Sequence, residues 1–314
     1  MRTLYTLLIG CLLCGPAMAR EIFVDNTAGD DRATGQQSRN TSDQTGPVRT
    51  IAKALWLAGN GDQIVLAKTN MPYRESITLV GNRHSGMSGQ PFAIKGNGAI
   101  LDGSAPVPPE AWEHFRGAVF RFRPSQMGYQ QLFFDDRPAV RVFASRLAGG
   151  VPQLEPRQWC SADGLIYFCV EKSKLPADYK LSYACEQTGV TLYHVDYVVL
   201  SDLIVQGYQI DGIGAANSVR HVSLVGVKCR GNGRSGVSVG GASLVDLDVC
   251  LLGNNGQAQL LTLPYGETHV RNSNLLPNTA PGWVDEGGRV YLGDKRVQGG
   301  LDEVRPITGN DIKP

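Results

Sequence analysis

The chain has 314 residues, of which 42% are hydrophobic and 8% aromatic, and its 30 basic and 29 acidic residues leave a formal charge of +1. This even balance provides no basic field for nucleic acid, and it argues against a specialist for polyanionic substrates such as pectate or alginate. The 38 glycines indicate a β protein dense in turns rather than a helical protein.

Residues 1–19 have the layout of a secretory signal peptide. Arg2 precedes an apolar run that ends at Leu13, and the tripeptide AMA at 17–19 supplies a small-x-small cleavage site. The run is shorter than the roughly 20 apolar residues that a membrane anchor needs, and the bulky Leu13 before Cys14 argues against a lipoprotein. No later segment is long and apolar enough to span a bilayer, so we expect a secreted, periplasmic or cell-envelope protein without a membrane span.

Residues 20–105 are predicted to form an N-terminal cap and the first strands. A short helix at 51–58 has one apolar face, made by Ile51, Ala54, Leu55 and Ala58. Such a helix can cover the open end of a stack of strands and protect its edge. The strand-like segments from NGDQIVLA (60–67) to AILDGS (99–104) then indicate the first one or two coils of a repeat.

Between residues 106 and 183 the chain shows no regular period. Three strand-like segments follow the prolines near 106: AVFRFR (118–123), QLFFDD (131–136) and AVRVFA (139–144). This pattern predicts an inserted antiparallel β subdomain. Aromatic residues are dense between Trp112 and Phe168, and we expect them to form the core of this subdomain in preference to a sugar-stacking surface.

Five cysteines lie outside the predicted signal peptide: Cys160, Cys169, Cys185, Cys229 and Cys250. The first two flank a predicted hairpin that turns at Asp163-Gly164. Whether they form a disulfide stays open, because the strand register decides how closely their β-carbons approach. Cys229 and Cys250 are expected to stack as buried thiols in successive coils, and no cysteine spacing indicates a zinc site.

The stretch from Thr188 to about Leu276 is a repeat. Its marker positions are 23 or 24 residues apart: Gly189, Gly212, Gly236 and Gln259. This period lies in the range of solenoid proteins. Each period contains three short strand-like segments without helical spacing, which describes one turn of a parallel β-coil.

Burial explains why these coils must stack. One apolar column is formed by Val190, Ile213, Val237 and Leu260, and a single coil could not bury its share of that column alone. Glycine and asparagine at the corners, as in Gly231-Asn232-Gly233, tolerate positive φ, and the asparagines can hydrogen-bond the neighbouring coil. We expect about four regular coils within 184–290 and a C-terminal tail at 291–314.

The repeat, with its corners NGRSGVSV (232–239) and NNGQAQLL (254–261), resembles the right-handed parallel β-helix proteins of the pectate-lyase-like superfamily. The resemblance implies an all-β solenoid with three short strands per coil, here with an N-terminal capping helix and an inserted antiparallel β subdomain. It also implies a secreted, carbohydrate-active protein. The corner motifs belong to the scaffold, which lyases, hydrolases, epimerases and tail-spike proteins share, so they do not specify a reaction.

In this fold class substrates lie along the first strand column, so its outward residues are candidate site residues. Neighbouring coils are about 4.8 Å apart, and Asp211 and Arg234 are therefore expected to meet. Gln257 and Gln259 on the next coil complete a polar patch and are the predicted substrate-binding residues. In a β-elimination, Arg234 is the base-side candidate and Asp211 the cation ligand or orienting group. The alternative is an ordinary ion pair that contributes roughly 0–1 kcal/mol.

A glycosidase needs two carboxylates flanking the scissile bond, and Asp211 has no such partner. The other aspartates of the repeat fall on the second and third columns: Asp196, Asp202, Asp246 and Asp248. His194 and His221 are interpreted as corner residues. Since no acidic cluster indicates a clear Ca²⁺ site, we expect no metal and no cofactor, and Ca²⁺ stays open as the alternative.

Two functional classes follow from the sequence. The first is an enzyme acting on an extracellular polysaccharide, with a lyase favoured over a glycoside hydrolase. The second is a non-catalytic glycan-binding or cell-envelope structural protein. In both classes the partner is an extracellular polysaccharide, and we expect a monomer.

The signal-peptide assignment predicts that exported protein begins at Arg20. Mass spectrometry of the protein recovered outside the cytoplasm should give the mass of the chain cleaved after Ala19. A first residue of Met1, or a lipid on Cys14, would contradict the assignment.

Overall fold

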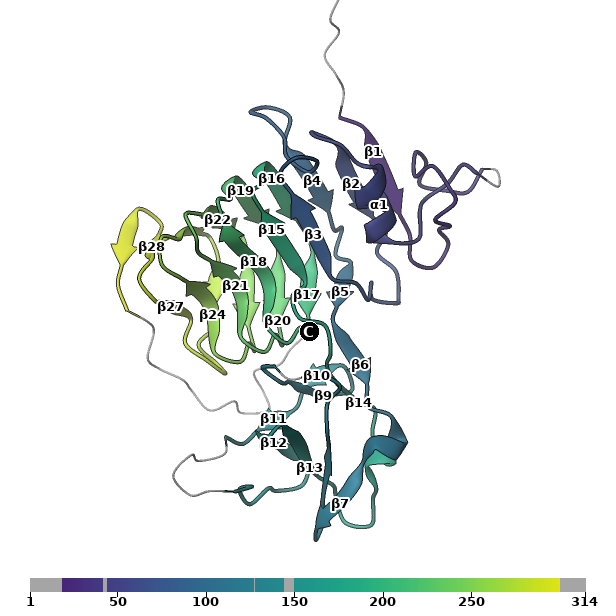
Figure 1. Cartoon of the computed structure of the whole chain (residues 1–314), viewed down its shortest axis with the longest axis vertical. Helices are drawn as coiled ribbons and strands as arrows, with labels where there is room; N and C mark the ends of the chain where they lie inside the picture. The colour runs from purple at the N-terminus through teal and green to yellow at the C-terminus, as the bar shows by residue number, and fades with distance from the viewer. Residues whose placement is uncertain (1–18, 42–43, 127, 144–149, 300–314) are drawn as a thin grey trace, which may run out of the picture.

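The computed structural model describes residues 19–41, 44–126, 128–143 and 150–299. The predicted signal peptide, except Ala19, and the predicted tail beyond residue 299 lie outside the described residues. The described chain is mostly β, with three parallel sheets and two small sheets that hang below them in Figure 1. Among the described residues, no helix combines the length and apolar character needed to cross a membrane.

The three parallel sheets form the body of the protein. Sheet 1 consists of β3 (Ile77–Val80), β15 (Val190–Tyr193), β18 (Asp211–Asn217), β21 (Ser235–Val239), β24 (Ala258–Thr262) and β27 (Trp283–Asp285). Sheet 2 consists of β1 (Glu21–Val24), β2 (Gln63–Leu66), β4 (Phe92–Lys95), β16 (Asp196–Ser201), β19 (Arg220–Val225), β22 (Leu244–Asp248), β25 (Glu267–Arg271), β28 (Arg289–Leu292) and β29 (Lys295–Val297). Sheet 3 consists of β5 (Ile100–Asp102), β17 (Ile204–Gln206), β20 (Lys228–Arg230), β23 (Leu251–Gly253) and β26 (Asn274–Leu275).

The described chain visits the sheets in the order 1, 2, 3 five times, from β3-β4-β5 to β24-β25-β26, and then adds β27 and β28. Each visit is a coil, and the coils stack from right to left in Figure 1. Successive strands pair in parallel, and the predicted column is confirmed: Val190 pairs with Ile213, Ile213 with Val237, and Val237 with Leu260.

Inward aliphatic side chains from all three sheets share one core. The four residues of the predicted column are at most 1% exposed, and Ile77 pairs with Val190 to extend the column toward the N-terminus. Burying a side chain of this size contributes roughly 1.5–3 kcal/mol. Every coil therefore depends on its neighbours for most of its stability.

The corner between sheets 3 and 1 contains a ladder of buried amides. The Asn232 backbone N–H donates to Asn255 Oδ1 at 3.0 Å, and Asn255 Nδ2 donates to Gln259 Oε1 at 2.8 Å. Tyr208 holds the same corner one coil earlier, where its backbone N–H donates to Asn232 Oδ1. The predicted hydrogen bonds between corner asparagines are thus present, and they satisfy backbone groups at a turn closed to water.

Both ends of the stack are covered. At the N-terminal end, α1 (Ile51–Leu57) packs Ile51, Ala54 and Leu55 into the core, and the Glu75 carboxylate accepts hydrogen bonds from the backbone N–H groups of Ile51 and Ala52. Burial raises the pKa of Glu75. At the C-terminal end, four partly buried side chains pack against the core: Leu275, Trp283, Leu292 and Val297.

The inserted subdomain interrupts the stack between two coils without disturbing their pairing, since β3, β4 and β5 pair directly with β15, β16 and β17. One of its sheets contains β6 (Ser104–Pro106), β9 (Leu132–Phe134), β10 (Arg137–Pro138) and β14 (Leu181–Ala184). The other contains β7 (Glu113–Arg116), β8 (Val119–Phe122), β11 (Val140–Arg141), β12 (Gln158–Ala162) and β13 (Leu165–Cys169). The pairing is antiparallel except between β11 and β12. Two short 3-10 turns, Pro109–Ala111 and Pro176–Asp178, complete it.

The aromatic residues of the insertion mainly form its core, as predicted. Trp159 and Phe168 are fully buried, while Phe143 is 66% exposed. The Asp163-Gly164 turn has the positive φ angles of a tight hairpin. This hairpin pairs Cys160 with Tyr167 rather than with Cys169, so the two cysteines are diagonal neighbours, and both thiols are free.

One alignment within the repeat was wrong by two residues. Cys229 pairs with Leu252, so Cys250 does not stack on it. The coil also continues beyond Leu276, because β27 and β28 pair with β24 and β25, and β29 folds back antiparallel on β28 within the predicted tail.

The amide ladder predicts a large effect for Asn255→Ala. The substitution leaves the buried Asn232 N–H without its acceptor and removes the Nδ2 hydrogen bonds to the Cys229 carbonyl and Gln259 Oε1, so the free energy of unfolding should fall by about 2–4 kcal/mol. Urea denaturation followed by intrinsic fluorescence measures the change. The exposed neighbour Gln257 provides the control, since Gln257→Ala should leave the midpoint in place; equal effects would contradict the ladder.

Candidate functional site

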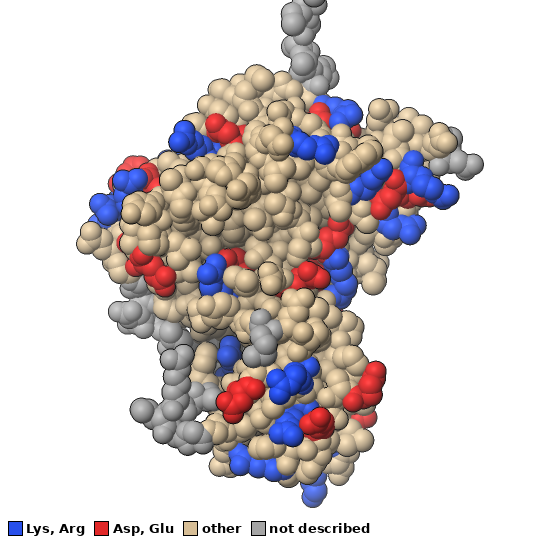
Figure 2. Space-filling model, viewed as in Figure 1, with Lys and Arg blue, Asp and Glu red and all other residues tan. Residues whose placement is uncertain are grey.

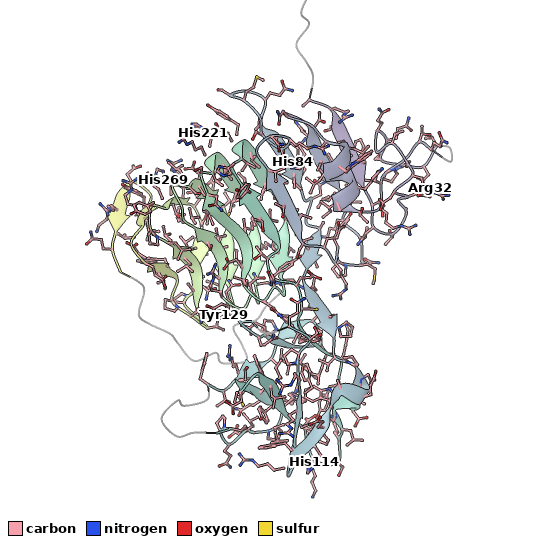
Figure 3. The ribbon with its side chains drawn as sticks, viewed as in Figure 1. Arg32, His84, His114, Tyr129, His221 and His269 are labelled. Atoms are coloured by element: carbon pink, nitrogen blue, oxygen red, sulfur yellow. The ribbon has the colours of Figure 1, made fainter. Side chains whose placement is uncertain are left out.

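A cavity of about 650 Å³ lies at the turns that lead from sheet 1 into sheet 2. Its lining comes from successive coils and from the final hairpin: Arg220, His221, Ala242, Ser243, Leu244, Tyr265, Gly266, Glu267, Gly287, Gly288, Arg289 and Arg296. Figure 3 shows His221 and His269 on the upper side of the stack, whereas Tyr129 lies near the insertion below. The cavity is therefore remote from the insertion.

One row of the cavity lining follows the coil period. Leu244 pairs with Glu267, and Glu267 pairs with Arg289, on three consecutive strands of sheet 2. His221 holds the equivalent position on β19, because it precedes Val222 as Leu244 precedes its partner Val245. These residues are 23, 23 and 22 positions apart along the chain.

The lining is cationic, with three arginines against one carboxylate. Glu267 accepts from Arg289 at 2.7 Å and lies 2.8 Å from His269 Nε2, so its charge is already engaged. Arg220 and Arg296 are exposed, and within the described part of the chain their side chains make no hydrogen bond or ion pair. The nearly neutral chain thus concentrates unpaired positive charge at this place. Figure 2 shows mixed, scattered charges on the face that it displays.

His221 belongs to an ordered group. Its Nδ1 lies 2.7 Å from Asp196 Oδ1, and its ring stacks on Tyr197 with centroids 4.3 Å apart and an angle of 7°. Tyr197 and His221 have φ angles of 51° and 47° at matching points of adjacent strands, an unusual backbone conformation for such side chains. With Nδ1–H donated to the carboxylate, Nε2 is an available proton acceptor.

A second histidine lies beside the cavity. His269 is flanked by Asp246, 3.5 Å from Nδ1, and by Glu267 at Nε2, and its ring meets Tyr291 edge-on at 4.8 Å. Both nitrogens of this imidazole therefore have carboxylate partners. It is less available for proton transfer than His221, which is 57% exposed at its side chain.

The structure brings Asp211 and Arg234 together as predicted, but as a closed pair. Arg234 donates from Nε and Nη2 to the two carboxylate oxygens at 3.0 and 2.5 Å, and the Ser235 hydroxyl donates to Oδ1 at 2.7 Å. Asp211 is only 3% exposed. The hydrogen bond from Arg234 to Asp211 raises the pKa of Arg234, which disfavours the predicted base-side role.

The two predicted substrate-binding glutamines do not form a patch with this pair. Gln257 is exposed on the turn, whereas Gln259 is fully buried and donates to the Ala280 carbonyl at 3.2 Å within the amide ladder. The preceding coils have glycine at the position equivalent to Gln259, which leaves room in the corner for the amides that bond to the Gln259 side chain. Gly236 leaves room for Asn255 Nδ2, 2.8 Å from where a β-carbon would stand.

The predicted site residues lie at the start of sheet 1, whereas the cavity lies where sheet 2 begins. His221 was interpreted as a corner residue, and Glu267 and Arg289 were not considered, although the 23-residue period already places them in one row. Arg296 could not have been found in this way, because it reaches the cavity from a hairpin outside the period. In the described residues, no group of three or more His, Cys, Asp and Glu side chains is arranged to hold a metal.

No protein-family model matches the sequence, and a search of curated proteins finds no relative. The fold is similar to that of a solved glycoside hydrolase, with a TM-score of 0.57 and 10% identity over 86% of this chain and 74% of that one. It is also similar to the complex of XylC with xylose, with a TM-score of 0.53 and 12% identity over 85% and 62%. The chain thus spans less than two thirds of the XylC structure, and at these identities the likeness concerns the fold alone.

The buried pair predicts that Asp211→Asn destabilises the protein. Arg234 would keep its partly buried charge without a counter-charge, so the free energy of unfolding should fall by about 3 kcal/mol, which urea denaturation can measure. Asp30→Asn, at an exposed pair with Arg32, is the matched control and should change nothing. Loss of sugar binding or turnover at unchanged stability would instead restore Asp211 as a site residue.

Proposed function

We propose that this protein acts on an extracellular polysaccharide that carries acidic groups, and that the cationic cavity is its site. The three parallel sheets are proposed to form a right-handed parallel β-helix, since crossovers between parallel strands are right-handed in about 98% of cases. The two similar solved structures named above concern sugars, one being a glycoside hydrolase and the other a complex with xylose. Their fold supports a carbohydrate-related role without specifying the reaction.

The observation that carries the proposal is the His221–Asp196 pair beside the unpaired Arg220. In a β-elimination, His221 Nε2 would take the proton α to a uronate carboxylate, and Arg220 would balance the charge that develops on that carboxylate. The bond from the sugar to the leaving oxygen then breaks and a C=C bond forms. The proton is finally returned to the leaving oxygen, so the reaction consumes no water. Asp196 acts as a positioning residue that fixes the imidazole tautomer.

A glycan-binding protein without turnover is the second candidate. It is favoured by one observation, namely that Glu267 is the sole carboxylate of the cavity lining and is held by Arg289 and His269. In the described lining, no carboxylate is therefore free to protonate a leaving oxygen. In either case we propose an exported protein that works as a monomer.

The lyase proposal predicts turnover of acidic polysaccharides that depends on His221. Purified protein is incubated with acidic and neutral polysaccharides, and unsaturated uronate absorbance and reducing ends are measured separately. His221→Ala should lower kcat/KM by about a hundredfold or more without changing the melting temperature. Asp196→Asn should shift the pH profile, because the amide no longer fixes the tautomer.

His114→Ala in the insertion is the control, since His114 is exposed and far from the cavity. Reducing ends without unsaturated product would identify a hydrolase and contradict the elimination. Binding without either product would favour the second candidate.

A further inference from the structure

The unpaired cations of the cavity lie at its two ends. Arg220 is on β19, the first strand of sheet 2 to line the cavity, and Arg296 is on β29, the last. Their order in the sheet is β19-β22-β25-β28-β29, so four strand spacings of about 4.8 Å, roughly 19 Å in all, separate the two strands. Both side chains line the cavity from these strands, so two acidic groups bound at its two ends belong to sugars that are not adjacent.

Small residues line much of the middle of the cavity. Gly266, Gly287 and Gly288 line it together with Ala242 and Ser243. Close backbone approach requires two of these glycines: a β-carbon would stand 2.4 Å from the Val239 carbonyl oxygen at Gly266 and 2.6 Å from the Leu263 carbonyl oxygen at Gly288. The result is a floor of backbone without projecting side chains, on which a sugar ring can lie flat.

Tyr265 projects beside this floor and is 82% exposed, more than any other large apolar or aromatic side chain of the described residues. Exposed aromatic rings of this kind stack on the apolar faces of sugar rings, which gain from the burial whether or not the sugar is charged. The middle of the cavity therefore offers stacking and no unpaired cation.

Glu267 makes the middle unfavourable for an acidic group. It occupies the centre of the row, and its ion pair with Arg289 balances the one arginine that lies next to it. An anionic sugar placed there would face a carboxylate without gaining a free guanidinium, and such like-charge contacts discriminate strongly between ligands.

We infer that the cavity selects a glycan in which acidic sugars alternate with neutral ones, and that it disfavours a homopolymer of uronic acid. This inference rests on the proposed function and specifies its substrate class. Arg220 and Arg296 bind two acidic groups that are separated along the chain. Tyr265 and the glycine floor receive the neutral sugar between them, and Glu267 excludes an acidic sugar from that position.

The test compares three sets of oligosaccharides of equal length by titration calorimetry: alternating acidic and neutral, all acidic, and all neutral. Measurements use the His221→Ala variant, so that no ligand is consumed. The alternating ligand should bind at least about tenfold more tightly than the other two. Arg220→Ala and Arg296→Ala should each weaken it about tenfold and reduce its salt dependence, whereas Arg123→Ala, an exposed arginine of the insertion, should not.

Glu267→Gln provides an independent measurement. It should raise the affinity for the all-acidic ligand and narrow the preference for the alternating one, with the melting temperature recorded to confirm folding. Equal or tighter binding of the all-acidic ligand by the unsubstituted cavity would overturn the inference while leaving the proposed function in place. Failure of every acidic ligand to bind would overturn both.

Discussion

The structure depends on the register between neighbouring coils. A coil buries its inward aliphatic side chains only when the next coil places equivalent residues directly beside them, as Ile213 does between Val190 and Val237. The backbone ladders and the buried amides of Asn232 and Asn255 enforce the same alignment from the corner. Hydrophobic burial, backbone pairing and corner chemistry therefore all favour one register, which is the consistency expected of a sequence with a single stable fold.

The same register builds the cavity on the outside of sheet 2. Residues one period apart in the chain become neighbours about 4.8 Å apart on the surface. A single substitution at Glu267 or Arg289 therefore changes the charge at one position of the row and leaves the other positions unchanged. The residues that hold the coils together differ from those that give the cavity its charge. Gln259 of the amide ladder is fully buried, whereas Arg220 of the cavity is exposed. Changes in charge at the cavity can thus alter ligand choice without altering the core.

The sequence was sufficient to predict the period, the first apolar column, the capping helix and the existence of the insertion, because each rests on a pattern of burial. It was less informative about the side-chain contacts of the candidate site residues. Asp211 and Arg234 were correctly predicted to meet. The sequence did not show that Arg234 and Ser235 together fill the hydrogen-bonding positions of the Asp211 carboxylate, or that the corner buries this carboxylate. The contact of His221 with Asp196 occurs beside two matching positive φ angles, at Tyr197 and His221, which the sequence pattern does not predict.

The position of the insertion has a consequence for how the protein folds. The chain leaves and re-enters the stack at one point, where the backbone N–H groups of Cys185 and Glu186 both donate to the Gly103 carbonyl. The coils from β15 onward pair with one another through strands that are about one period apart in sequence, so these coils can assemble by short-range steps. The coil of β3, β4 and β5 must instead wait for a long loop to close, which costs entropy before any contact forms. Folding is therefore expected to start in the C-terminal coils and to finish when the N-terminal coil and its capping helix dock onto them.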